Sequence, residues 1–365
     1  MQSRFHTLDY LRGLAALSIM LYHYAGFVYG HFEADTLLGR LGVYGVSIFY
    51  ILSGLTLYLV YNKRWDNSLV TIKEFALKRV FRIFPLMWAV VLGAVLLNGQ
   101  IPNIEKLALN LTGLFGFIRP TAYLSMGMWS IGNELVFYAF FPVLMFLLKK
   151  HSSLFLTFVA ALCLVYGYFA FSVLDQSKTL AEQWGLYINP LNQVALFALG
   201  VVMGYCFKKV TVSVNGAGAL LLLGAAAFVF YPTEGDAINL VAGVNRIAFT
   251  AIMAVICFSF YKLPVRLPNW IHKPLTLLGE VSYGVYLLHP LVWSAITFAL
   301  GIAHIEIPIL LKLAFAVPVT FILSYLVYNY FEKYFIKLGK RFTQPPLSSI
   351  RVEKLREVSM KEVAD

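Results

Sequence analysis

The chain has 365 residues, of which 60% are hydrophobic and 13% are charged, and its mean hydropathy is +0.75. This composition excludes a soluble globular domain of the same length and indicates a protein solvated mostly by lipid, so that the lipid bilayer is its first partner. The net charge of +11 requires no nucleic acid, because basic loops beside an anionic membrane surface account for it. We therefore expect no nucleic-acid partner.

Apolar windows of about 20 residues, the length that crosses a bilayer as a helix, recur along the chain. They predict an all-α, polytopic bundle of about ten transmembrane helices. We expect the first window to be a retained helix and not a signal peptide, because Arg12 and His23 interrupt it and no small-residue cleavage site closes it. In chain order the windows fall near residues 8–28, 39–61, 80–98, 129–148, 152–173, 190–207, 213–231, 241–261, 275–300 and 308–330.

Basic residues are concentrated on alternate connections between these windows. Of the 29 Lys and Arg residues, 22 fall on the set that includes both termini, and the other set holds four, namely Arg40, Lys106, Arg119 and Lys178. This asymmetry predicts that both termini are cytoplasmic. We assign residues 1–341 to one membrane domain and 342–365 to a charged cytoplasmic tail, and we expect a short interfacial helix within 99–128.

The three cysteines all fall inside predicted spans. They are Cys163, Cys206 and Cys257. An odd number of cysteines in such positions argues against a disulfide framework or a zinc site. We expect no metal.

Arg12 and His23 lie eleven positions apart in the first predicted span. On a helix this spacing places both side chains on one face, roughly 16 Å apart along the axis. Ionisable groups inside a membrane are costly, and for that reason they are functional candidates. The alternatives are that Arg12 extends to the interface and that His23 is a hydrogen-bonded core residue.

Glu134 lies about as far from the outer end of its span as His23 does from the outer end of the first. A carboxylate beside a histidine fixes the imidazole tautomer and favours the imidazolium formed on proton abstraction. We therefore predict a catalytic pair in which Glu134 orients His23. The alternative is that Glu134 caps a neighbouring helix or lines water.

A second cluster lies at the predicted cytoplasmic face, where Lys78, Arg79 and Arg82 precede Pro85. Arg79 and Arg82 are neighbours on a helix, and Arg12 enters the membrane at the same level. Because Arg binds phosphate in a bidentate manner, the three arginines suit a multiply phosphorylated cytosolic ligand. Ordinary positive-inside anchoring is the alternative.

Five motifs follow one another in the chain, and each is weak on its own. They are LDYLRGLAA at 8–16 with His23, FYILSG at 49–54, RVFRIFP at 79–85, WS at 129–130 with ELVFY at 134–138, and SYGVYLLH at 282–289. In this order they resemble the signatures of the acyltransferase 3 family of integral-membrane carbohydrate O-acyltransferases. The resemblance extends from about residue 5 to residue 335.

The resemblance implies an enzyme of the bacterial cytoplasmic (inner) membrane that transfers an acyl group, commonly acetyl from acetyl-CoA, to a hydroxyl of a cell-surface or exported carbohydrate. Arg12 and His23 match the family's first-helix Arg and His, and Glu134 matches its acid after Trp-Ser. Arg79 and Arg82 match its paired arginines. By this resemblance the arginines bind acyl-CoA, and His23, oriented by Glu134, acts as base or acyl carrier.

Weaker substrate-binding candidates each have a structural alternative. His289 lies near the middle of its span and is either hydrogen-bonded structure or part of the chemistry, and Arg246 either holds an acidic acceptor or extends to the interface. Ser53 lacks a basic partner in its local sequence, which favours helix packing. The candidates are Trp129, Ser130, Arg246, Tyr286 and His289.

A secondary transporter or flippase for a glycolipid or acidic solute is the alternative function, since His23, Glu134 and Arg246 would also suit a relay of protons or solute. The sequence shows none of the inverted hydropathy symmetry that marks many transporters. The acceptor sugar, the acyl group and the choice between direct transfer and an acyl-histidine intermediate stay open.

Overall fold

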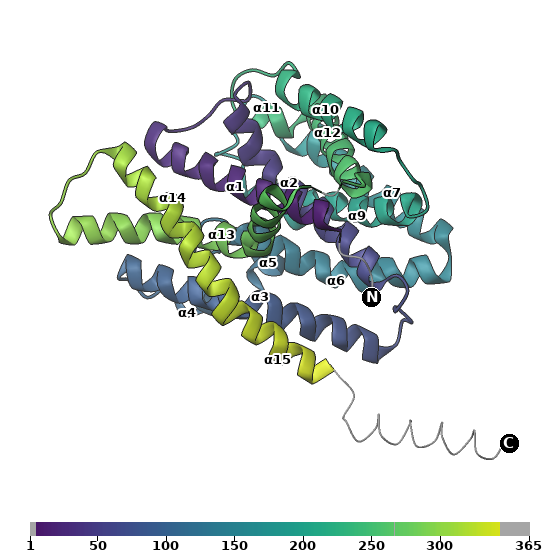
Figure 1. The fold of residues 1–365 in the computed structure, drawn as a ribbon, viewed down its shortest axis with the longest axis horizontal. Coiled ribbons are helices and arrows are strands. Elements are labelled where there is room, and N and C mark those ends of the chain that lie inside the picture. Colours follow the sequence, from purple (N-terminus) through teal and green to yellow (C-terminus); the bar gives the residue numbers. More distant parts are fainter. Residues whose placement is uncertain (1–4, 266, 344–365) are drawn as a thin grey trace, which may run out of the picture.

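The computed structural model describes residues 5–265 and 267–343, and within these ranges the chain is helical without strands. The predicted all-α class is confirmed, and the helices form one bundle (Figure 1). The elements are α1 (His6–Tyr29), α2 (Leu37–Tyr61), α3 (Leu69–Asn98), α4 (Ile104–Thr112), α5 (Phe115–Ile118), α6 (Met128–Lys150), α7 (Ser152–Tyr168), the π-helix η1 (Phe169–Val173), α8 (Trp184–Tyr187), α9 (Pro190–Phe207), α10 (Val214–Phe230), α11 (Ile238–Val241), α12 (Gly243–Lys262), α13 (Asn269–Ile302), α14 (Ile309–Leu326), the π-helix η2 (Val327–Glu332) and α15 (Lys333–Thr343).

Nine helical segments of the described chain are long and apolar enough to cross a membrane. The chain is therefore a multi-pass membrane protein. The expected number of such segments was ten, and α10 is the one that falls short. Its 17 residues rise about 25 Å, which is less than the hydrocarbon thickness of about 30 Å.

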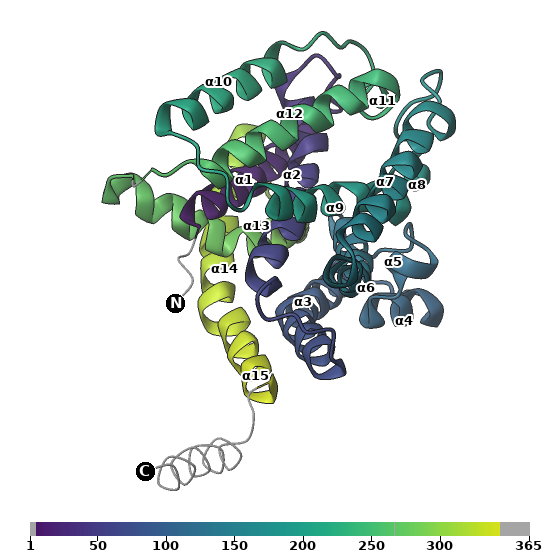
Figure 2. The same cartoon turned by 90° about the vertical axis from the view of Figure 1, so that its right-hand side faces the viewer.

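α10 packs antiparallel against α12 along part of its length (Figure 2). Arg40 binds its last turn, donating hydrogen bonds to the carbonyls of Phe228 at 2.7 Å, Val229 at 2.6 Å and Tyr231 at 2.7 Å. These are the carbonyls that a helix leaves without partners at its C-terminus. Arg40, expected in an exposed connection, is instead buried in the first turn of α2 and holds α10 in place.

Two helices extend beyond their predicted limits. α3 begins at Leu69, well before residue 80, because the Ser68 hydroxyl caps it by accepting from the Thr71 amide at 3.1 Å. Arg79 and Arg82 consequently lie on a helix. The last predicted span also continues, and α14, η2 and α15 form one segment of 35 residues.

The most basic connections meet at one end of the bundle. Lys149 and Lys208 both donate to Asn62, at its carbonyl and its side-chain oxygen, each at 2.7 Å. The ring of Phe5, just before α1, lies 5.6 Å from that of Tyr261 near the end of α12. We call this the basic end; α1 begins there, and α2, α6, α9 and α12 end there. Connections that the sequence groups by their Lys and Arg content thus lie at one end of the bundle, and the cytoplasmic position of that end stays a prediction.

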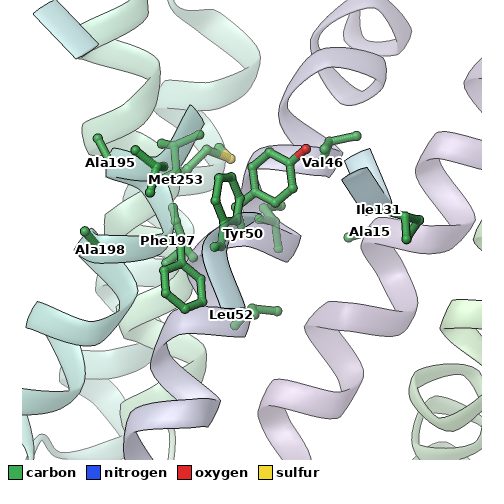
Figure 3. Close-up of a cluster of buried hydrophobic side chains, with 14 of the residues drawn as sticks. Ala15, Val46, Tyr50, Leu52, Ile131, Ala195, Phe197, Ala198 and Met253 are labelled. Carbon is green, nitrogen blue, oxygen red and sulfur yellow. The ribbon is translucent and has the colours of Figure 1, made fainter. Parts of the chain in front are cut away.

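The centre of the bundle is the contact between α2 and α9, where two glycines allow the backbones to approach. A Cβ atom on Gly54 would lie 2.0 Å from the carbonyl oxygen of Phe197, and one on Gly200 would lie 2.0 Å from that of Ile51. Small residues permit this close helix packing in membranes. Figure 3 shows the apolar side chains around this contact, including Tyr50, Leu52, Phe197 and Met253.

α1 is packed between α2 and α13. Gly13 and Gly279 make the second contact of this type, because a Cβ on Gly279 would lie 2.2 Å from the Asp9 carbonyl oxygen. This packing directs the Arg12 and His23 face of α1 toward α2 and α13.

The short helix predicted within 99–128 is present as α4, followed by the single turn α5. Of the predicted tail, 342–365, the first two residues close α15, and residues 344–365 lie outside the described residues.

Candidate active site

A cavity of about 600 Å³ extends from the basic end into the bundle. It lies among α1, α2, α3, α6, α13 and the final helix. Phe5 and Tyr61 line it near the basic end, and Ser130 and Tyr286 line it deeper inside. The cavity therefore joins the basic end to the middle of the bundle.

The structure brings Arg12, Arg79 and Arg82 together in the wall of this cavity, as expected from the sequence. Arg82 forms an ion pair with Glu332, whose side chain is 2% exposed, and its guanidinium lies 5.2 Å from the centre of the Tyr283 ring. Arg12 contacts Asp9 more loosely, at 3.4 Å. Two of the three arginines thus already have a carboxylate neighbour.

Arg79 differs from the other two arginines. Its guanidinium carbon lies 5.7 Å from the centre of the Tyr138 ring and 6.0 Å from that of Phe75, and its Nε is buried without a hydrogen-bond partner. No carboxylate of the described residues pairs with it. Its charge is available to an anionic ligand.

Glu134 belongs to the same cavity. Its Oε1 accepts hydrogen bonds from the Ser53 hydroxyl at 3.1 Å and from the Tyr138 hydroxyl. Tyr138 follows Glu134 by four residues and so lies on the same face of α6. The carboxylate is held beside the arginines, where its bond to Tyr138 fixes the ring that faces Arg79.

His23 has a different partner from the predicted one. Its Nδ1 lies 2.8 Å from Nε2 of His289, while the hydrogen bonds of Glu134 go to Ser53 and Tyr138. The predicted direct pair of His23 and Glu134 is therefore corrected to a pair of histidines. The reason is the packing of α1, whose His23 face meets α13 and α2 and not α6.

Tyr286 separates the cavity from the histidine pair. Its hydroxyl lies 2.7 Å from Ser130 Oγ at the inner end of the cavity, and its ring centre lies 6.1 Å from that of His289. His289 follows Tyr286 by about one helical turn, on the side away from the basic end. A group at the inner end of the cavity would therefore approach the histidines past Tyr286.

Trp129 and Arg246 do not line the cavity. The Trp129 ring packs against those of Trp184 and Tyr187, at 5.4 and 5.9 Å between centres. Arg246 is 2% exposed; it donates to the Asn192 carbonyl at 2.8 Å and lies over the Tyr166 ring. Arg246 therefore neither extends to the interface nor contacts His23 or Glu134.

Sequence reasoning assigned Ser53, Tyr138 and Glu332 no role in the site. Tyr138 could have been predicted, because it follows Glu134 by four residues and so lies on the same face of the helix. Glu332 fell just beyond the predicted end of the last span at 330, whereas the helix continues and buries its carboxylate. Ser53 was expected only to pack between helices, and its bond to Glu134 depends on the contact of α2 with α6.

The fold and cavity define a multi-pass membrane protein with a cationic cavity that leads toward a pair of histidines. The model of an acyltransferase domain matches residues 5–329. The chain belongs to the acyltransferase 3 family. The predicted family is confirmed over nearly the whole membrane portion.

Several curated proteins are similar to this chain. The peptidoglycan O-acetyltransferase OatA of Listeria monocytogenes is 25% identical over 359 residues, covering 89% of this chain and 55% of the relative. A protein of Komagataeibacter xylinus, named provisionally as the membrane-bound transacylase BcsY, is 25% identical over 327 residues, covering 82% of this chain and 74% of the relative. The chain thus spans about half the length of the Listeria protein. No solved structure matches it.

Proposed function

We propose that the chain is a membrane O-acyltransferase that moves an acyl group, in the first instance acetyl, from cytosolic acyl-CoA to a hydroxyl of a cell-surface or exported carbohydrate. Membership of the acyltransferase 3 family supports the class of reaction. The printed name of the Listeria relative, a peptidoglycan O-acetyltransferase, supports a carbohydrate acceptor.

The observation that carries the proposal is the cavity with arginines at one end and Tyr286 at the other. Coenzyme A has its phosphates at one end of a flexible arm and its thioester at the other. Guanidinium groups bind phosphate by charge-assisted hydrogen bonds. The phosphates would lie at Arg12, Arg79 and Arg82, and the arm would extend along the cavity toward Tyr286.

The direction of this path follows from the charge asymmetry. The basic end carries the connections rich in Lys and Arg, which favours a cytoplasmic position. A cytosolic donor would enter there, and its acyl group would travel toward the opposite side, where an exported carbohydrate is available. The chain would then act in the bacterial cytoplasmic membrane.

His23 is the proposed base or acyl carrier. In direct transfer, His23 takes the proton of the sugar hydroxyl as the oxygen bonds to the thioester carbonyl carbon; the C–S bond breaks, and coenzyme A leaves with that proton. In the second route the imidazole first bonds to the acyl carbon and coenzyme A leaves as a thiolate; the sugar oxygen then displaces the imidazole, and the hydroxyl proton passes to the coenzyme A sulfur. Both routes yield the same ester and free coenzyme A.

The test uses purified protein in lipid nanodiscs, acetyl-CoA labelled in the acetyl group, and candidate glycan acceptors. We expect label in the glycan with the wild type, no label with His23→Ala, and unchanged binding of coenzyme A by both. The enzyme proposal would be wrong if the label never left acetyl-CoA while the same preparation moved a glycolipid or acidic solute across a vesicle membrane. That result would favour the transporter.

A further inference from the structure

We propose that His289 is a positioning residue that holds His23 in the tautomer with a proton on Nδ1 and a free lone pair on Nε2. The inference rests on the proposed function, because it gives the reactive nitrogen of His23 a specific identity. It stands on two hydrogen bonds that connect Val285, His289 and His23 in series.

The first bond fixes the tautomer of His289. Its Nδ1 lies 3.0 Å from the carbonyl oxygen of Val285, one helical turn earlier. A carbonyl oxygen has no hydrogen to donate, so the proton lies on Nδ1 of His289. A neutral imidazole carries one proton on its two nitrogens. Nε2 of His289 is therefore a hydrogen-bond acceptor.

A neutral His289 is the form that its surroundings favour. The side chain is 0% exposed, and no carboxylate of the described residues pairs with it. Burying an unpaired imidazolium in such a site would be costly.

The second bond transmits the tautomer to His23. The acceptor Nε2 of His289 lies 2.8 Å from Nδ1 of His23, so Nδ1 of His23 must donate. Its proton is thereby used, and Nε2 of His23 carries the lone pair. The His23 side chain is only partly buried, and Nε2 has no hydrogen-bond partner among the described residues. This nitrogen is free to accept a proton from a hydroxyl.

The two rings are held rigidly relative to each other. They are nearly parallel, with 12° between their planes. The Tyr24 hydroxyl, on the turn of α1 that carries His23, donates to the backbone carbonyl of His289 at 2.9 Å and lies 2.6 Å from Thr320 on α14. The Tyr24 hydroxyl thus connects the turn of α1 that carries His23 to the backbone of α13 at His289.

In the reaction, Nε2 of His23 takes the proton of the acceptor hydroxyl while the hydroxyl oxygen bonds to the thioester carbonyl carbon. Nδ1–H of His23 continues to donate to His289 throughout, so the transient imidazolium keeps its partner. The same proton then passes to the coenzyme A sulfur as the C–S bond breaks. His289 exchanges no atom with substrate.

The role of His289 is tested by two replacements of similar size, one with a hydrogen-bond acceptor and one without a strong acceptor. In Gln, the carboxamide oxygen is as many bonds from Cβ as Nε2 is in His, so His289→Gln retains an acceptor for His23. His289→Met fills a similar space without a strong acceptor. General-base catalysis contributes about 10²–10⁴-fold to a rate. We expect His289→Met to lower kcat about 100-fold with an unchanged KM for acetyl-CoA, and His289→Gln to restore most of kcat.

A second measurement reads the tautomer without activity. In protein labelled with ¹⁵N-histidine and held in lipid bilayers, magic-angle-spinning NMR distinguishes protonated from unprotonated ring nitrogens, and the His23 signals are assigned by their loss in His23→Gln. We expect an unprotonated Nε2 in the wild type and in His289→Gln, and mixed tautomers in His289→Met.

These measurements separate the inference from the proposed function. A wild type that transfers no acyl group would defeat the proposed function, while the NMR spectrum still decides the pairing of the histidines. A protonated Nε2 of His23 in the wild type, or full kcat in His289→Met, would overturn the role of His289 alone. Equal loss of kcat in the Gln and Met variants would also overturn it.

Discussion

The three arginines of the cavity are not equivalent as ligands for phosphate. Arg82 must share its charge with Glu332, and Arg12 has Asp9 beside it, whereas no carboxylate of the described residues pairs with Arg79. A guanidinium with a carboxylate partner gains less from an incoming phosphate. Arg79 is therefore the main proposed phosphate contact.

Arg79→Gln is expected to weaken coenzyme A binding about tenfold or more, because a hydrogen bond to a charged group contributes about 1.5–3 kcal/mol. Isothermal titration of the nanodisc-embedded protein measures the effect. Arg119→Gln is the matched control, since Arg119 forms an exposed ion pair with Glu105. The assignment would be wrong if Arg79→Gln and the control bound coenzyme A equally well.

At the residue scale, the sequence predicted the arginine cluster but not the partner of His23. Arg79 and Arg82 are close in sequence, so helical spacing alone places them together. The pair formed by His23 and His289 joins residues 266 positions apart, and it depends on which helices are neighbours. Equal depth in the membrane, the argument for Glu134, does not determine that neighbour.

Among the elements, the π-helix η2 has the clearest link to the site. π-Helical turns are rare and occur often at functional sites. Here η2 ends at Glu332, whose carboxylate reaches Arg82 on α3. The final helix therefore places a buried carboxylate behind Arg82, which lines the cavity.

Glu332→Gln removes this charge while keeping the shape of the side chain. We expect a lower thermal midpoint in detergent, corresponding to a loss of about 1–3 kcal/mol in the free energy of unfolding. This loss is smaller than that for a fully buried pair, because the Arg82 side chain is 29% exposed. Glu105→Gln, which breaks an exposed pair, should change stability by about 0–1 kcal/mol. Equal midpoints for both variants would argue against a structural role of the Glu332 pair.

The close contact of α2 with α9 predicts that adding one methyl group there will strongly destabilise the protein. In Gly200→Ala the new Cβ would lie 2.0 Å from the Ile51 carbonyl oxygen, so the helices must separate. Overpacking of this kind costs about 1–3 kcal/mol. Gly167→Ala on α7, where a Cβ meets nothing within 4 Å, is the control. Fluorescence-detected size-exclusion after heating compares the two, and equal survival would contradict the close approach.

At the element scale, hydropathy predicted where most helices lie but not all their limits. The early start of α3 depends on the Ser68 cap and on turns that carry Lys73 and Lys78, which a hydropathy window excludes. Hydropathy also gave no reason for the shortness of α10. That helix ends where Arg40 donates hydrogen bonds to its last carbonyl groups.

For the whole molecule, the orientation in the membrane is testable with single cysteines. In a chain whose three natural cysteines are replaced by Ala, Lys208→Cys lies at the basic end and Lys178→Cys lies in the connection at the opposite end. We expect a membrane-impermeant maleimide to label Lys178→Cys on intact cells and Lys208→Cys only after permeabilisation. The reverse pattern would place the basic end outside and remove the proposed entry route for cytosolic acyl-CoA.

The Arg40 contacts also constrain the order in which the protein is assembled. Arg40 leaves the ribosome with α2, but the groups that it binds on and after α10 follow 188 to 193 residues later. At usual rates of synthesis this interval is about ten to forty seconds. During that time the guanidinium must stay hydrated at the membrane surface. The arrival of α10, which corresponds to the seventh of the ten predicted windows, is then the event that allows the beginning of α2 to be buried. The N-terminal helices therefore reach their final depth only after most of the membrane domain has been synthesised.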